Sequence, residues 1–319
     1  MKRWIHILLN ILSLALFGLI LWWGGPEAWL QILDSRWQDV LIACVLYGFA
    51  GMVSAWRLQV AAESLTAGWV APWRRFFYVN MTARALGLVL PRALSSLGGK
   101  SVGLRAFGIP IARSVWIVLV DNLFDILVLG VLTLPSLLLF RDLVSPLGYY
   151  LFAGGVMIVL ALLLWWGILT RWLLILLTWI HRIPWLSKRI KLDTQTAETI
   201  LPAPKPALQL QGLTLVLSLA IGLTYFFIAR AISISVPLSA ILASFAIVQL
   251  SLIIAVAPGG LGIFDLGWLG LLHLIGVPED QALTFVIAQR TYIFVFVLIW
   301  AAVSVLLSFT VKDSKEQEI

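Results

Sequence analysis

The sequence predicts an all-α, multi-pass integral membrane protein. Of its 319 residues, 61% are hydrophobic and only 12% are charged, against about a half and a quarter in soluble domains. The mean hydropathy is +1.02, and the apolar residues are gathered in runs long enough to cross a bilayer as helices. Such a composition excludes an ordinary soluble enzyme and a disordered chain.

Seven apolar runs carry few or no charges over about the 20 residues that a helix needs to cross the hydrocarbon core. We predict a membrane span in each: residues 5–23, 40–56, 114–140, 147–170, 208–229, 238–257 and 282–310. The first run follows Lys2 and Arg3 as a signal peptide would, but no small-residue cleavage site follows Trp22 and Trp23. We therefore expect it to be retained as the first span.

Two further apolar stretches, residues 76–109 and 259–275, are interrupted by Pro and Gly. Each is expected to form either a short span or a re-entrant helical hairpin, which gives seven or eight spans in total and leaves the side of the C-terminus open. Structural roles in these two broken regions are predicted for Pro91, Gly98, Gly99, Pro258, Gly259, Gly260 and Gly262.

Positive charge in the loops predicts the orientation, because Lys and Arg are retained on the cytoplasmic side. Lys2 and Arg3 precede the first span, and Arg57, Arg74 and Arg75 follow the second, so both ends of this hairpin are expected in the cytoplasm. Residues 171–207 hold six Lys or Arg against two acids, and are predicted to be a cytoplasmic linker. We expect a plasma-membrane protein with a cytoplasmic N-terminus and one domain over residues 1–310. Its halves are about 1–170 and 208–310, and 311–319 are a polar tail.

Signals of enzyme chemistry fail on inspection. Residues 98–101 read Gly-Gly-Lys-Ser, as at the end of a phosphate-binding loop, but Leu94 stands where the first glycine is required. The three histidines are scattered, and no Gly-x-Ser-x-Gly elbow is present. We therefore expect no enzyme activity, no cofactor and no metal. The net charge of +7 lies in loops between apolar runs, so no nucleic-acid partner is expected.

The two broken regions resemble each other. The first carries Gly-Ile-Pro at 108–110 and the second Gly-Val-Pro at 276–278, an offset of 168 positions. At this offset Asp121-Asn122 falls on Gln289-Arg290, so polar residues recur at one depth of both long helices. The pattern indicates either an internal structural repeat, which is common in transporters, or the chance placement of Pro and Gly in membrane helices.

A few charges lie inside the apolar runs, where each costs about 2.5–3.5 kcal/mol on insertion scales and marks a candidate functional residue. Asp121 and Asp125 are four residues apart and share a helical face, with Asn122 beside them. Arg290 is the one cation within the last long run, and we predict that it pairs with the two carboxylates. This pairing would either hold the halves together or contact a substrate.

The first broken region contains four cations with no acid between them: Arg84, Arg92, Lys100 and Arg105. Set among glycines, they suit an anion such as a lipid phosphate, although positive-inside anchoring of a cytoplasmic loop would also account for them. Asp265, in the second region, either orients an amine or sugar hydroxyl or caps a short helix.

Together these motifs, over about residues 40–310, resemble the flippase-like transmembrane region of lysylphosphatidylglycerol synthases and their stand-alone relatives. The resemblance implies broken helices around a lipid-accessible cavity and, for the best-known relatives, translocation of aminoacylated phosphatidylglycerol between leaflets. The chain ends nine residues after Thr310, so lysyl transfer from tRNA is not expected. The residues that carry the resemblance are Leu90-Pro91, Gly98-Gly99, Arg105, Asp121-Asn122-x-x-Asp125, Pro258-Gly-Gly-Leu-Gly262-Ile-Phe-Asp265, Gly276-Val-Pro and Arg290.

The preferred function is movement of an anionic phospholipid or lipid-linked sugar between leaflets, without ATP hydrolysis by this chain. One alternative is a non-transporting membrane partner of a glycosyltransferase or lipid-modifying enzyme, and another is an intramembrane lipid-modifying enzyme. In the preferred scheme membrane lipids are the partners, three cations gather the phosphate, and further polar residues form a path for the headgroup. The predicted substrate-binding residues are Arg92, Lys100 and Arg105, then Asp121, Asn122, Asp125, Asp265 and Arg290.

Overall fold

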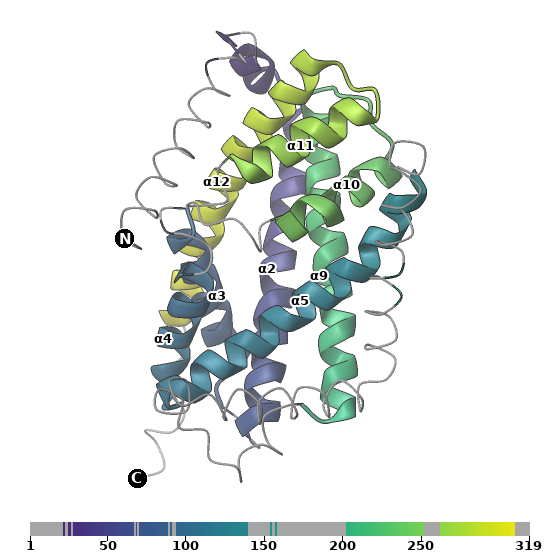
Figure 1. Ribbon diagram of the computed structural model, residues 1–319. Coiled ribbons are helices and arrows are strands. Elements are labelled where there is room, and N and C mark those ends of the chain that lie inside the picture. The colour runs from purple at the N-terminus through teal and green to yellow at the C-terminus, as the bar shows by residue number, and fades with distance from the viewer. Residues whose placement is uncertain are drawn as a thin grey trace, which may run out of the picture.

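The computed structural model describes residues 28–139 except 67, 69, 89 and 91–93, together with residues 202–251, 262–309 and a few isolated positions. The predicted spans at 5–23 and 147–170, and most of the predicted linker at 171–207, lie outside the described residues. Regular structure within the described ranges is helical throughout (Figure 1). The order is α2 Trp37–Thr66, α3 Trp73–Leu86, the π-helix η1 Leu94–Gly99, α4 Lys100–Arg105, α5 Ile111–Leu139, α9 Pro204–Ala231, α10 Leu238–Ser251, α11 Ile263–Leu274 and α12 Glu279–Phe309.

Four of these helices, α2, α5, α9 and α12, are long and apolar enough to cross a membrane. Their 28 to 31 residues, at about 1.5 Å of rise each, exceed the roughly 30 Å of a hydrocarbon core. They correspond to the predicted spans at 40–56, 114–140, 208–229 and 282–310. The largest shift is in α2, which continues ten residues past Trp56 because Leu58, Val60, Ala61 and Ala62 extend its apolar surface.

Helix α3 has 14 residues, a length of about 21 Å that does not reach across the hydrocarbon core. The described part of α10 is also 14 residues long. The predicted span at 238–257 is helical over Leu238–Ser251, and its remaining residues lie outside the described part of the chain. The predicted broken regions at 76–109 and 259–275 contain the short helices η1, α4 and α11. Of their predicted structural residues, Pro91, Pro258, Gly259 and Gly260 lie outside the described residues.

Helix bounds recur at the predicted offset of 168 positions along both halves. Moved by this offset, α2 would span 205–234 and α5 would span 279–307, close to the observed α9 and α12. Likewise, α3 would span 241–254 and the η1–α4 segment 262–273, close to α10 and α11. Gly108 and Gly276, which occupy equivalent positions before α5 and α12, have φ of 84° and 86°. Only glycine adopts this left-handed conformation without strain.

The first helices of the two halves, α2 and α9, lie side by side and antiparallel (Figure 1). The Arg36 N–H, just before α2, donates to the Ala231 carbonyl at the end of α9 at 2.9 Å. Asp39, at the start of α2, pairs with Arg230 at 3.5 Å. Further along α2, Arg57 Nη1 donates to Thr214 Oγ1, nearer the start of α9, at 3.1 Å. Because equivalent helices run in opposite directions, the two halves have opposite orientations.

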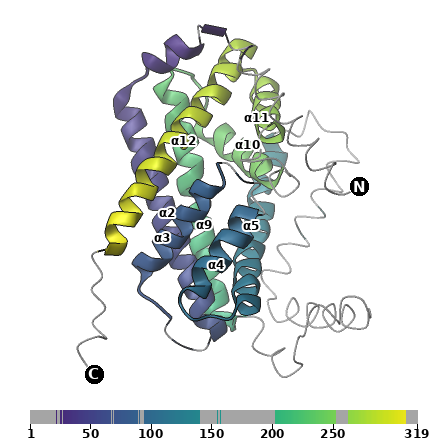
Figure 2. The same cartoon turned by 90° about the vertical axis from the view of Figure 1, so that its left-hand side faces the viewer.

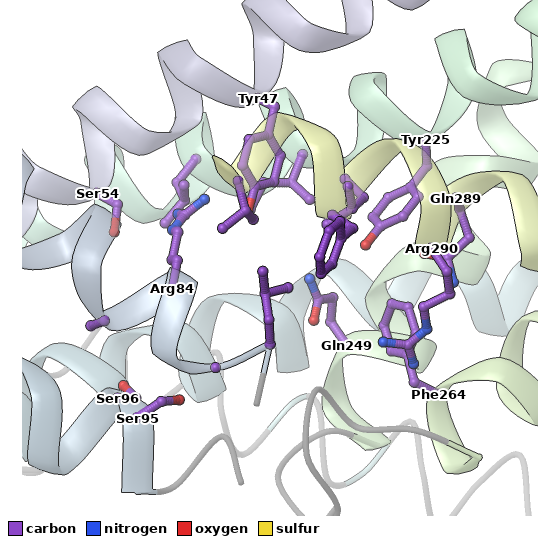
Figure 3. A pocket seen from close by; sticks show the side chains of 18 of the residues that line it. Tyr47, Ser54, Arg84, Ser95, Ser96, Tyr225, Gln249, Phe264, Gln289 and Arg290 are labelled. Atoms are coloured by element: carbon purple, nitrogen blue, oxygen red, sulfur yellow. The ribbon is translucent and has the colours of Figure 1, made fainter. Parts of the chain in front are cut away.

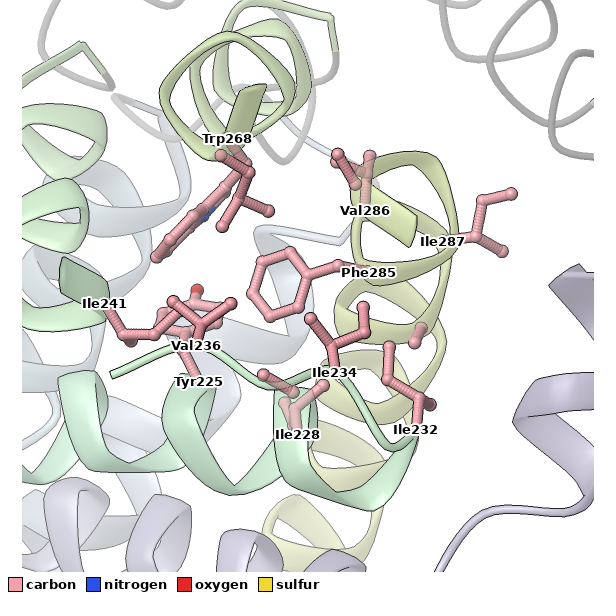
Figure 4. Packing of buried hydrophobic residues seen from close by; sticks show 14 of the residues in the cluster. Tyr225, Ile228, Ile232, Ile234, Val236, Ile241, Trp268, Phe285, Val286 and Ile287 are labelled. Atoms are coloured by element: carbon pink, nitrogen blue, oxygen red, sulfur yellow. The ribbon is translucent and has the colours of Figure 1, made fainter. Parts of the chain in front are cut away.

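The short helix of each half packs against the last long helix of the other half: α3 lies against α12, and α10 lies against α5. Figure 2 shows α12 crossing obliquely in front of α2 and α9, as α5 does in Figure 1. The apolar core of the second half is built around Trp268, with Tyr225 and Phe285 at ring-centroid distances of 5.1 and 5.0 Å (Figure 4). The first half has its own core around Phe76, Phe77 and Phe124.

Candidate functional site

A buried ion cluster joins α2, α4 and α5 in the first half. Arg57 Nε donates to Asp121 Oδ1 at 2.7 Å, Arg57 Nη2 donates to Asp125 Oδ2 at 3.0 Å, and Arg57 Nη1 also contacts Asp125. Lys100 Nζ donates to the other Asp121 oxygen at 2.9 Å. Arg57 is 1% exposed and Asp121 is 0% exposed. Two cations therefore balance two carboxylates, which is how buried charges become tolerable.

This cluster corrects the predicted pairing of Arg290 with Asp121 and Asp125. The described partners of those carboxylates are Arg57 and Lys100, and Arg290 belongs to another cluster. The prediction was wrong because Arg57 was assigned to a cytoplasmic loop, whereas it lies inside α2. The apolar residues that follow Arg57 were the signal that could have placed it there.

A second ion cluster joins α11 and α12. Arg290 Nε donates to Asp265 Oδ1 at 2.6 Å, and Gln289 Nε2 donates to the same oxygen at 3.4 Å. The other Asp265 oxygen accepts the Gly262 N–H at 2.9 Å, so Asp265 also caps the start of α11. The Arg290 guanidinium lies 5.1 Å from the centroid of the Phe264 ring. Asp265 therefore combines the capping role with a charge partner.

The two clusters occupy equivalent places in the two halves. In the first half, α4 supplies an ion to Asp121-Asn122 of α5. In the second half, α11 supplies an ion to Gln289-Arg290 of α12. These two residue pairs coincide at an offset of 168 positions. The signs are reversed, since α4 supplies the cation Lys100 and α11 supplies the anion Asp265. The polar positions that the sequence placed at one depth therefore both contact the preceding short helix, although Lys100 and Asp265 are three positions apart at this offset.

A cavity of about 670 Å³ lies between the two halves. Figure 3 shows Ser54, Arg84, Ser95 and Ser96 on one side of it and Tyr225, Gln249, Phe264 and Arg290 on the other. Both ion clusters reach its wall. The charged and amide side chains that line it are Arg57, Asn80, Arg84, Lys100, Asn122, Asp125, Gln249, Gln289 and Arg290, and the apolar lining includes Trp29, Leu88, Leu129, Phe245 and Phe294.

The predicted substrate-binding residues divide into four groups by position. Lys100, Asn122, Asp125 and Arg290 line the cavity. Asp121 and Asp265 are fully buried directly behind it, each bonded to a lining cation. Arg105 is exposed at the end of α4 and is not among the lining residues, and Arg92 lies outside the described residues. Gly98 and Gly99 end the π-helix, and Gly262 precedes α11.

Two cations that line the cavity, Arg57 on α2 and Arg84 on α3, are not among the predicted substrate-binding residues, although Arg84 is one of the four cations of the first broken region. The Arg84 guanidinium lies 5.3 Å from the centroid of the Tyr47 ring of α2, which holds it against the cavity wall (Figure 3). No described carboxylate forms an ion pair with it. The acid-free stretch from Arg84 to Arg105 was the sequence signal for this group, although only the folded chain separates Arg84 and Lys100 from Arg105.

The side chains that line the cavity could bind a polar ligand group between apolar helices. The cavity volume falls in the range of about 300–1,000 Å³ that small-molecule sites occupy. Its lining combines guanidinium and ammonium donors, amides and hydroxyls with apolar side chains. Within the part of the chain that the structure describes, no three His, Cys, Asp or Glu side chains meet as a metal site would require.

A family model of the lysylphosphatidylglycerol synthase transmembrane region matches residues 10–301. The chain belongs to this family. The lysylphosphatidylglycerol synthase transmembrane match spans both halves, both ion clusters and the cavity between them. It confirms the family that the Pro-Gly-Gly and Gly-Val-Pro motifs predicted. Comparison with curated proteins gives no match.

Family membership and the four apolar helices together make this a membrane protein of lipid-related processes. Ion clusters buried between such helices are expected where polar groups line a cavity. The position of the cavity between two halves of opposite orientation is also where transporter sites commonly lie.

Proposed function

We propose that the cavity admits the headgroup of an anionic phospholipid or a lipid-linked sugar, and that the protein moves this lipid between leaflets without hydrolysing ATP. One observation carries the proposal: a cavity of about 670 Å³ within the apolar helical bundle is lined, in the described part of the chain, by four cations and several amide and hydroxyl groups among apolar side chains. A headgroup needs polar contacts to leave the interface, because an unsatisfied polar or charged group in hydrocarbon is costly. The acyl chains would remain in the bilayer beside the apolar helix faces.

The opposed halves supply a route for alternating access. We interpret α2 to α5 and α9 to α12 as an inverted-topology repeat, with α3–α4 and α10–α11 as re-entrant pairs. In such proteins an exchange of conformation between the halves opens the site to the other side of the membrane. The equivalent clusters at Asp121 and Asp265 would then guide a headgroup from either side.

Lipid exchange in proteoliposomes tests this proposal. Fluorescent phosphatidylglycerol in both leaflets is bleached from outside with an impermeant reductant, and exchange exposes the inner-leaflet pool. The wild-type protein should accelerate its loss over protein-free vesicles. Ser96→Trp, which fills the cavity from η1, should return the rate to the protein-free level. The control is Val102→Trp on the neighbouring α4, because Val102 is 65% exposed. This variant should exchange lipid as the wild type does.

Equal leaflet exchange with and without protein, over several lipid classes, would contradict the proposal. Copurification of a glycosyltransferase or lipid-modifying enzyme would then favour a non-transporting partner. A new lipid product formed by the purified protein and a lipid donor alone would instead indicate an intramembrane enzyme.

A further inference from the structure

The charges of the described residues around the cavity do not balance. Among the described residues, four cations reach its wall: Arg57, Arg84, Lys100 and Arg290. Their carboxylate partners are Asp125 on the wall and the buried Asp121 and Asp265. Four cations against three carboxylates leave one positive charge in excess. Since each of the other three cations has a carboxylate partner, the excess is located at Arg84.

Arg84 is arranged to bind an anion. Its guanidinium lies 5.3 Å from the centroid of the Tyr47 ring, and a cation–π contact of this kind does not use the N–H donors that a ligand would need. It is only partly buried and faces the cavity on the same side as Ser95 and Ser96 (Figure 3). Arginine donates two parallel hydrogen bonds to phosphate oxygens, and such charge-assisted bonds are the stronger ones.

We propose that Arg84 binds the phosphodiester of a lipid that carries a single net negative charge and a hydroxylated headgroup. This inference rests on the proposed function in so far as a lipid headgroup enters the cavity. One negative charge brings the cavity to neutrality, which a low-dielectric site favours. A zwitterionic headgroup adds a cation, and a lysylated headgroup is net positive, so both leave the excess charge in place.

The hydroxylated part of the headgroup has its own partners in the cavity, on the side of Arg84 and across from it. Ser96 Oγ donates to Asn122 Oδ1 at 3.4 Å, and Gln249 faces the same space from α10 (Figure 3). These hydroxyl and amide groups donate and accept hydrogen bonds without adding charge. They match a glycerol or sugar hydroxyl better than they match an ammonium group, which has no acceptor.

Binding of short-chain lipids to the purified full chain tests this inference. The probes are dioctanoyl phosphatidylglycerol, dioctanoyl phosphatidylcholine and glycerophosphoglycerol, which is the same phosphodiester without acyl chains. We expect the wild type to bind the phosphatidylglycerol about tenfold or more tightly than the phosphatidylcholine, which corresponds to about 1.4 kcal/mol. Both lipids offer Arg84 the same phosphodiester, but the choline cation adds a positive charge beside those of the cavity. Glycerophosphoglycerol should bind more weakly, since no acyl chain is buried.

Variants at Arg84 separate charge from geometry. Arg84→Gln should lose most of the preference for phosphatidylglycerol, whereas Arg84→Lys should keep the preference with a severalfold weaker affinity. Arg74→Gln makes the same charge change at an exposed position of the same helix and should bind as the wild type does. Each variant is compared only if its unliganded Tm and elution profile match the wild type, and the Lys variant serves if the Gln variant does not fold.

Three results would overturn the inference: equal wild-type affinity for the two lipids, an Arg84→Gln variant with full preference, or glycerophosphoglycerol binding as tightly as the lipid. The last would assign the site to a soluble phosphodiester. These results are independent of lipid exchange. If the protein exchanges lipid but shows no Arg84-dependent preference, the proposed function stands and the inference fails. If it binds phosphatidylglycerol selectively but does not exchange lipid, only the inference stands.

Discussion

Arg57 holds both α5 carboxylates through one guanidinium. Nε contacts Asp121 and the two Nη atoms contact Asp125, which uses the fork geometry that a lysine ammonium lacks. The remaining Asp121 oxygen is taken by Lys100. Removing any one ion leaves an uncompensated charge between α2 and α5, so single substitutions in the cluster are expected to destabilise the fold.

Arg57→Gln should therefore destabilise the protein strongly. Breaking a buried pair by removing one partner costs about 3–5 kcal/mol, and here two carboxylates would share Lys100 alone. Arg57→Lys should cost less, because it keeps the charge and loses only the second contact. The measurement is the thermal midpoint of the purified protein in detergent. An Arg57→Gln midpoint equal to the wild type would show that the cluster has no role in stability.

Substituting either member of the Asp265–Arg290 ion pair should lower stability by a different amount, because the two side chains differ in burial. Arg290 is 18% exposed at its side chain and Asp265 is 0% exposed. Arg290→Gln leaves a buried anion, whereas Asp265→Asn leaves a cation that water in the cavity can reach and retains an oxygen for the Gly262 N–H. The Arg290 variant should thus be the less stable of the two.

A double-mutant cycle measures their coupling. For contacting residues the interaction energy is about 0.5–3 kcal/mol, so the double variant should be more stable than the sum of the single effects predicts. Additive effects, or a larger loss for Asp265→Asn, would argue against the pair as described.

At the scale of elements, helix contacts depend on particular small residues. A Cβ placed on Gly48 of α2 would lie 2.0 Å from the nearest ring atom of Trp300 of α12. The indole is also fixed, because Trp300 Nε1 donates to the Cys44 carbonyl at 2.8 Å. The close approach of α2 and α12 therefore requires glycine at position 48, and the hydrogen bond limits how far the ring could move.

Gly48→Ala should lower the thermal midpoint, because overpacking of a fixed contact costs about 1–3 kcal/mol. The matched control is Gly212→Ala in α9, where no atom lies within 4 Å of the added Cβ. There the change should be neutral or slightly stabilising, since alanine is the better helix former. Equal midpoints for the two variants would contradict the α2–α12 contact.

At the scale of the whole molecule, the antiparallel α2 and α9 fix which loops share a side of the membrane. The end of α2 and the start of α9 lie together, as do the start of α2 and the end of α9. The membrane orientation predicted from loop charge relied on Arg57 as well as on Arg74 and Arg75. With Arg57 inside α2, Arg74 and Arg75 are the cations that follow this helix in the next segment, and the cation-rich residues 171–207 lead into the adjacent start of α9.

Cysteine labelling checks this arrangement in a background where Cys44, the single cysteine, is replaced by alanine. Gly68→Cys and Lys205→Cys should react with an impermeant maleimide from one side of the membrane. Asp34→Cys and Ser233→Cys should react only from the other. Labelling of Gly68→Cys and Lys205→Cys from opposite sides would make α2 and α9 parallel and remove the inverted arrangement.

The sequence by itself determined the all-helical membrane class, the family and the offset of 168 positions. These follow from local properties, because hydrocarbon requires each spanning helix to satisfy its own backbone and to carry an apolar surface. The glycines at 108 and 276 could likewise be identified as turns, since their conformation is set by their own backbone.

Only the tertiary structure decided which charges meet. Arg57 and Asp121 are 64 residues apart in sequence, and Lys100 and Asp121 are 21 apart. No local pattern states that these residues face one another, because ion pairing depends on how whole helices pack and cross. The same packing put Arg105 on the surface and Arg84 in the cavity, although both belong to one acid-free stretch of sequence.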